Sequence, residues 1–284
     1  MPTKTAKKNS SPKPVPAPQM LLAPGENPLV PHETLRQMYL KMVHARLLTE
    51  HLARKPKTKL SASVHGQEAC RASVAQGLAQ GDLVADSQPD TLMNVVLGAN
   101  VFEVLRKKPA TPSSLMPFLD DADDRLNATL GAAFALKHHG RNGVAVVFLE
   151  QEEAGNKLWR RSLTVAAQQE LPILFIALAG TKHDGHARLT AVAHASGVAG
   201  IAVDAGDAIA LYRVAQESMI RLRTGGGPVL IEAIVFRTGT KSKALAPDPV
   251  TVMRQCLLQR KATTEAWIKN VESTFRQQLA KARP

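Results

Sequence analysis

Residues 143–149 read Gly143-Val-Ala-Val-Val-Phe-Leu149, and residues 171–179 read Leu171-Pro-Ile-Leu-Phe-Ile-Ala-Leu-Ala179. Both runs are apolar throughout instead of alternating, which is typical of strands that are covered by helices on both faces. The segment between them, Lys157 to Gln168, has helical patterning, as does Ala128 to Lys137 ahead of them. This order of elements predicts an α/β fold with a mostly parallel sheet and helices on both faces.

The rest of the chain continues the alternation of helix and strand. A helix is expected from Pro31 to His51 with a core stripe of Leu35, Met38, Tyr39 and Met42, and another begins at Gly66. The following segments complete the expected order: helix Ala187 to Ser196, strand Gly200 to Asp204, helix Ala208 to Arg223 after an Asp207 cap, strand Pro228 to Arg237, and a final helical segment. Both early helices are expected to bury apolar surface in an oligomer.

Composition bounds the class of protein. The 284 residues allow one or two domains and a sizeable core, and aromatic residues are only 4% of the chain. Residues 1–30, rich in proline, lysine and serine, are expected to form a disordered basic arm, and residues 31–284 a single domain. No apolar run is long enough to span a membrane, and Cys70 and Cys256 are too few for a disulfide framework. The cytoplasm is the expected compartment.

Nucleic-acid binding is a weaker alternative. The formal net charge is +12, so that the folded part is basic as well as the arm. The charges are interspersed along helices, however, without a stripe of basic and aromatic residues, and no helix-turn-helix or zinc signature is present. Basic domains are also common among proteins that handle small anionic substrates.

Several strings in the chain resemble a known family. These are Gly66-Gln-Glu-Ala69, Gly81-Asp82, Ala145-Val-Val-Phe-Leu-Glu-Gln151, Leu171-Pro-Ile-Leu-Phe175, Gly227-Pro-Val-Leu-Ile-Glu-Ala233 and Asp248-Pro249. Together and in this order they resemble the alpha subunit of the 2-oxo acid dehydrogenase E1 component, of the pyruvate and branched-chain types. The resemblance covers roughly residues 32–282. It implies a thiamine diphosphate-binding fold in an α2β2 assembly, in which a beta subunit supplies the catalytic glutamate.

The resemblance also implies a cofactor site, where the alpha subunit holds Mg²⁺ and the diphosphate of thiamine diphosphate. The family's Gly-Asp-Gly loop, whose aspartate is a metal ligand, corresponds to Leu149-Glu150-Gln151. Glu150 is therefore the candidate metal ligand, and Glu150, Gln151, Asn156 and Lys241 are the candidate cofactor-binding residues. Lys241 stands where the family has a histidine, and lysine is a common phosphate binder.

Most of the family's ligand positions are nevertheless substituted. Leu149 and Gln151 replace glycines, so side chains are expected where the family's backbone approaches the diphosphate. Gln88-Pro89 stands where a Tyr-Arg pair grips the diphosphate, Ala62 replaces a histidine, and residues 178–182 lack the family's Asn-Asn-x-Tyr string. The substitutions predict lost or weakened binding of the cofactor and of Mg²⁺. No residue of this chain is assigned a catalytic role.

Two functions follow from this resemblance. In the first, the chain is an E1-alpha-like subunit with a structural or regulatory role, in a homo-oligomer or bound to a beta-type E1 subunit, with E2 as a further possible partner. In the second, it is an active thiamine diphosphate-dependent oxidative decarboxylase that passes the product of a 2-oxo acid to a lipoyl group.

Overall fold

A computed structural model describes residues 30–54, 65–106, 114–154, 157–178, 189–235 and 248–282. Its sheet has five parallel strands in the order β1-β2-β3-β5-β4. The strands are β1 (Leu83–Ala85), β2 (Ala145–Glu150), β3 (Ile173–Leu178), β4 (Ala199–Asp204) and β5 (Val229–Ile234). The predicted α/β class with a parallel sheet is confirmed. Residues 1–29 of the expected basic arm lie outside the described part of the chain.

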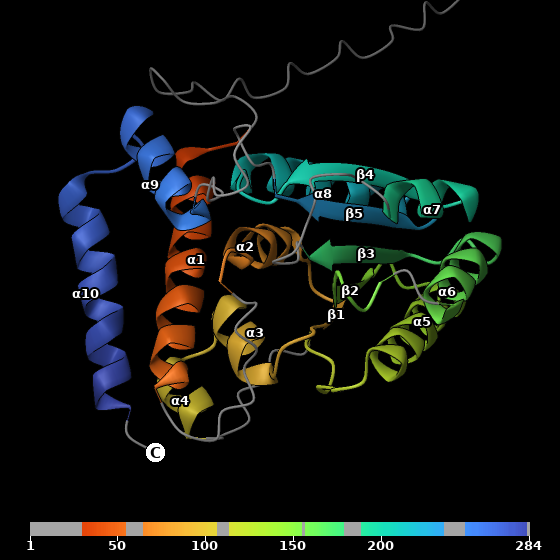
Figure 1. Ribbon diagram of the computed structural model, residues 1–284, viewed down its shortest axis with the longest axis horizontal. Coiled ribbons are helices and arrows are strands. Elements are labelled where there is room, and N and C mark those ends of the chain that lie inside the picture. The colour runs from red at the N-terminus through yellow and green to blue at the C-terminus, as the bar shows by residue number, and fades with distance from the viewer. Residues whose placement is uncertain are drawn as a thin grey trace, which may run out of the picture.

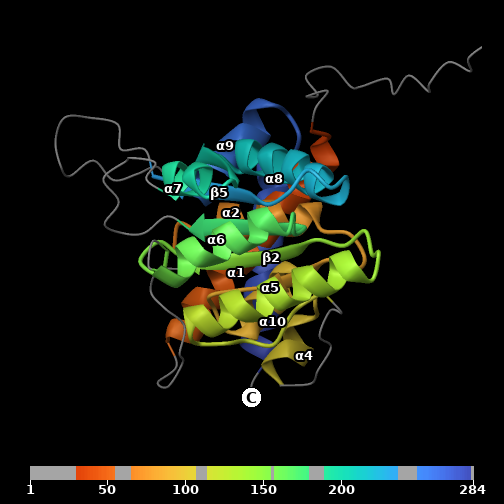
Figure 2. The same cartoon turned by 90° about the vertical axis from the view of Figure 1, so that its right-hand side faces the viewer.

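The described residues contain these helices: α1 (His32–Ala53), α2 (Glu68–Gly77), α3 (Asp90–Val96), α4 (Val101–Leu105), α5 (Ala122–His138), α6 (Lys157–Gln168), α7 (Leu189–Ala195), α8 (Ala208–Arg223), α9 (Pro249–Gln259) and α10 (Glu265–Lys281). They flank the sheet on both sides, with α5 and α6 on one side and α1, α9 and α10 on the other (Figure 1). Seen from the side, α5 and α6 run across the sheet in front of β2 (Figure 2).

Alternate side chains of the central strands enter two separate hydrophobic cores. Phe148 and Ile176 point into the core shared with α1, α2 and α8. Val147 and Phe175 point into the core shared with α5, α6 and α7. This alternation explains why these strands are apolar at every position, since both faces of the sheet are covered.

The helix α1 is buried more fully than its sequence suggests. The predicted core stripe is confirmed, because Leu35, Met38, Tyr39 and Met42 are all inaccessible to solvent. They pack within this chain, where α1 contacts α2, α3, α9 and α10. The apolar residues of α2 are buried in the same core. The expectation that both helices keep apolar surface for an oligomer is therefore wrong: the chain itself covers that surface.

Local signals placed most helix ends correctly. Asp207 caps α8 as predicted, accepting hydrogen bonds from the backbone N–H groups of Ile209 and Ala210. Three differences stand out. Helix α5 begins at Ala122 because the Asp121 carboxylate caps it, the short strand β1 was not predicted, and the final helical segment is divided between α9 and α10, with Lys261 at a positive φ in the break. No helix among the described residues is long and apolar enough to cross a membrane.

Candidate functional site

The candidate site lies where β1 and β2 end side by side. Glu150 is the last residue of β2, and residues 86–88 follow β1 directly. Gln67 lies at the N-terminus of α2, which packs against this part of the sheet. Because the carboxyl ends of parallel strands share one edge of the sheet, this is the position at which α/β proteins usually bind ligands.

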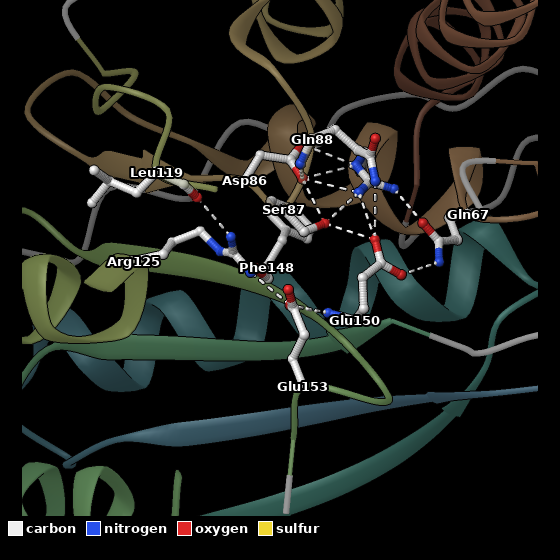
Figure 3. Close-up of polar contacts among 10 residues, drawn as sticks. Gln67, Asp86, Ser87, Gln88, Leu119, Arg125, Phe148, Glu150 and Glu153 are labelled. Carbon is white, nitrogen blue, oxygen red and sulfur yellow. Dashed lines mark hydrogen bonds and ion pairs between the residues drawn. The ribbon is translucent and has the colours of Figure 1, made fainter. Parts of the chain in front are cut away.

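The carboxylate of Glu150 is engaged by side chains of this chain (Figure 3). Its Oε2 accepts a hydrogen bond from Gln67 Nε2 at 2.8 Å. Its Oε1 accepts one from Ser87 Oγ at 2.8 Å and one from Gln88 Nε2 at 3.3 Å. Both carboxylate oxygens of the candidate metal ligand therefore already have partners from the β1–α3 loop and from α2.

A buried arginine, Arg71 of α2, lies behind this carboxylate. Its guanidinium forms a two-pronged pair with Asp86, with Nε–Oδ2 and Nη2–Oδ1 distances of 2.9 Å. Nη1 donates to Gln67 Oε1 at 2.7 Å and Nη2 to Ser87 Oγ at 3.0 Å. Nη2 also lies 3.7 Å from Glu150 Oε1. Among the described ion pairs, the cation that faces Glu150 is therefore the Arg71 side chain.

The turn after β2, for which the resemblance implies a diphosphate-binding role, is held from the other side of the sheet. Glu153 Oε2 accepts hydrogen bonds from Arg125 Nη2 at 2.6 Å and from the backbone N–H of Glu150 at 2.8 Å. Arg125 also donates to the backbone carbonyls of Leu119 and Phe148 (Figure 3). The arginine therefore joins α5 and the segment before it to the end of β2.

By the resemblance, Leu149 stands where the family has a glycine, and its side chain was expected in the cofactor site. The Leu149 side chain is buried in the core shared with α5 and α6, because successive side chains of a strand point to opposite faces. The expectation that it enters the cofactor site is wrong. Gln151 is partly exposed in the turn that follows β2.

A second ion-pair network ties the start of α2 to two other helices. Glu68 accepts hydrogen bonds from Arg46 of α1 and from the backbone N–H of Gly66. The same arginine donates from Nη2 to Asp248 Oδ1 at 2.6 Å, and Asp248 caps α9. Glu68 is buried and paired, so the string Gly-Gln-Glu-Ala acts here as a structural joint between α1, α2 and α9.

The structure brings together only part of the predicted site. Glu150 and Gln151 are described, whereas Asn156 and Lys241 lie outside the described residues. Sequence reasoning missed Arg71 and Asp86. A signal for both exists: Arg71 interrupts a run of small and apolar residues in α2, and Asp86 directly follows the apolar strand β1.

Comparison with known proteins identifies the fold's family. The family model described as "Dehydrogenase E1 component" matches residues 122–282, which is more than half of the chain. This chain belongs to the dehydrogenase E1 component family. The family is thiamine diphosphate-dependent, and the resemblance inferred from the sequence strings is confirmed.

Relatives with known names are similar over much of the chain. The pyruvate dehydrogenase E1 component subunit alpha of Staphylococcus aureus is 27% identical over 237 residues, which are 76% of this chain and 64% of that protein. The 3-methyl-2-oxobutanoate dehydrogenase subunit alpha of Mycobacterium tuberculosis is 28% identical over 255 residues, 83% of this chain and 69% of that protein. The chain thus spans about two thirds of the length of these alpha subunits.

The described residues can be compared with what the E1 family's cofactor needs. Mg²⁺ takes a nearly ideal octahedron of oxygen ligands. Within the described ranges, no group of three or more His, Cys, Asp or Glu side chains is arranged to hold a metal ion. The carboxylate at the position of the family's metal ligand, Glu150, is turned toward Gln67, Ser87 and Gln88. A metal ion at Glu150 would have to compete with these internal partners for the carboxylate oxygens.

Proposed function

We propose that this chain is an E1-alpha-like subunit that takes part in a 2-oxo acid dehydrogenase type of assembly without holding the cofactor itself. Its role there is structural or regulatory. The fold and the family membership support the first part of this proposal. The contacts of Glu150 support the second.

The engagement of Glu150 is the observation that carries the proposal. Mg²⁺ dehydrates reluctantly and tolerates little misplacement of its ligands. If the Glu150 carboxylate turned away to bind a metal ion, it would lose the hydrogen bonds that Gln67 and Ser87 donate to it, both 2.8 Å long. These donors would then be left without their acceptor in a largely buried place, which is unfavourable. This engagement of Glu150 supports the proposal that it does not serve as a Mg²⁺ ligand.

The position of Gln88 supports the same conclusion. In the resemblance, residues 88 and 89 occupy the place of a Tyr-Arg pair that grips the diphosphate. Gln88 instead donates to Glu150 Oε1 at 3.3 Å, and it is buried. By the resemblance, the residue at this position would contact the diphosphate. Gln88 instead donates a hydrogen bond to the Glu150 carboxylate of the same chain.

The assembly itself is the remaining part of the proposal. The relatives from Staphylococcus aureus and Mycobacterium tuberculosis are named as alpha subunits. By this likeness we propose a beta-type E1 subunit as the partner, with a homo-oligomer and contact with E2 as the other forms of association.

The test uses the full chain with an affinity tag, recovered under native conditions together with its partners. Light scattering should give a particle larger than the 30.6 kDa of one chain, and a monodisperse monomer would overturn the proposed assembly. Decarboxylation of pyruvate and of branched-chain 2-oxo acids, with a lipoyl acceptor, is then measured on the same sample. Any turnover should be unchanged in Glu150→Ala, with the exposed Glu217→Ala as the matched control. Turnover that Glu150→Ala abolishes would establish the active decarboxylase instead.

A further inference from the structure

We propose that the guanidinium of Arg71 is a built-in counter-cation for Asp86 and Glu150, which keeps this edge of the sheet folded without a divalent metal ion. The inference rests on the proposed function, because it explains how a site that does not bind the cofactor is stabilised. It assigns a role to a residue that neither the family's strings nor the candidate site residues include.

The geometry connects Arg71 to both carboxylates. Asp86 receives the direct two-pronged contact, with two donor–acceptor distances of 2.9 Å. This is the arrangement in which a guanidinium and a carboxylate pair most strongly. Glu150 Oε1 lies 3.7 Å from Nη2 of the same guanidinium. One positive charge therefore faces two negative charges from two neighbouring strand ends.

Two polar side chains bridge Arg71 to Glu150. Ser87 Oγ accepts from Arg71 Nη2 at 3.0 Å and donates to Glu150 Oε1 at 2.8 Å. Gln67 accepts from Arg71 through Oε1 at 2.7 Å and donates to Glu150 Oε2 through Nε2 at 2.8 Å. Each bridge is polarised in the same direction, from the cation toward the carboxylate, so each supports the negative charge of Glu150.

Burial makes this charge balance necessary. The Arg71 side chain is inaccessible, the Asp86 side chain is 2% exposed and the Glu150 side chain is 14% exposed. The guanidinium also lies 5.7 Å from the ring centroid of Phe148, a further favourable contact for a cation. Removing one partner of a buried ion pair leaves an uncompensated charge, which is strongly destabilising. Without Arg71, the carboxylates of Asp86 and Glu150 would lack the cation that lies beside both of them, and a divalent cation is the alternative counter-charge that carboxylate oxygens accept.

The test is a charge rescue measured by thermal denaturation of the full chain. Arg71→Met keeps much of the side-chain volume and removes the charge, and it should lower Tm by about 5 °C or more. Adding Glu150→Gln and Asp86→Asn to this variant removes the unbalanced charge while keeping the shapes, so Tm should recover in part. Further loss of Tm on adding these two substitutions would overturn the inference.

Divalent metal gives an independent readout on the same variants. Millimolar MgCl₂ should raise the Tm of Arg71→Met above that in NaCl of equal ionic strength, and should leave the wild-type Tm unchanged. If Arg71→Met yields no folded protein, recovery of folded protein in the triple variant supports the inference, and failure of the triple variant to fold overturns it. Binding of thiamine diphosphate by the wild-type chain would instead overturn the proposed function, and it is measured separately from this rescue.

Discussion

Arg125 Nη2 lies 2.6 Å from Glu153 Oε2, and this pair fixes the turn that follows β2. The same carboxylate oxygen accepts the backbone N–H of Glu150. The turn is therefore held by an ion pair within the chain itself.

Removing the charge of Arg125 should loosen this turn. The arginine is almost completely buried, and it also donates to the carbonyls of Leu119 and Phe148. We expect Arg125→Met to lower the free energy of unfolding by roughly 3 kcal/mol, since it leaves a charge and two carbonyls without their donor. Urea denaturation measures this loss, and hydrogen exchange at the Glu150 amide should become faster. Arg160→Met, on the exposed face of α6, is the control, and equal effects of both variants would contradict the account.

The buried carboxylate of Asp82 lies at the amino ends of β1 and β2. Asp82 accepts hydrogen bonds from the backbone N–H groups of Ala79 at 2.7 Å and Val144 at 2.9 Å, and it pairs with Arg223. Asp82→Ala leaves these donors unsatisfied and should cost about 3 kcal/mol of unfolding free energy. Chemical denaturation tests this, with Asp204→Ala as the control because Asp204 is exposed and bonds only a local turn. A loss no larger than that of the control would rule out the role given to Asp82.

Stability should fall on the acid side because of His44. Its ring stacks on Phe275, with centroids 3.8 Å apart. Burial, together with the nearby Lys41, lowers the pKa of His44 from 6.5 to about 4. A histidine with a depressed folded-state pKa contributes stability that is complete above the unfolded pKa and is lost as the pH falls from 6.5 toward 4.

Protonation of His44 should lower the free energy of unfolding by roughly 2 kcal/mol, after allowance for its partial exposure. His44→Phe keeps the stack and removes the titration. We therefore expect the wild type to lose more unfolding free energy than this variant when the pH is lowered from 7.5 to 4.5. The exposed His139→Gln variant should show no such change. A pH-independent difference for His44→Phe would refute the assignment.

The two thiols should react very differently. Cys70 is buried beside Arg71, and burial raises the pKa of its thiol to about 12. Cys256 is partly exposed. A thiol reagent should therefore label one cysteine in the native protein and two in denaturant, and the native Cys256→Ser variant should stay unlabelled. Rapid labelling of that variant would show that α2 opens more readily than its packing implies.

The fold could be predicted from the sequence wherever a local signal decides an element. The apolar runs gave β2 and β3, the Asp207 cap gave the start of α8, and the spacing of Leu35 to Met42 gave the buried stripe of α1. Strand β1 was not predicted because it has only three residues, which are too few for a periodic signal.

The candidate site was harder to predict because its contacts join residues far apart in the chain. Glu150 was found from its place in a motif, but its partners lie 62 to 83 residues away. No spacing rule relates Arg71 to Asp86 and Glu150; only the packing of α2 against the strand ends does. Motif comparison could show that ligand positions had changed, whereas the structure was needed to find which groups now engage Glu150.

The most direct test of the central claim is a calorimetric titration of thiamine diphosphate with Mg²⁺ into the protein recovered with its native partners. We predict no saturable heat of binding, so wild type and Glu150→Ala should give the same flat trace. Micromolar or tighter binding by the wild type would contradict the account, and its loss in Glu150→Ala would show that Glu150 leaves Gln67 and Ser87 to hold the metal.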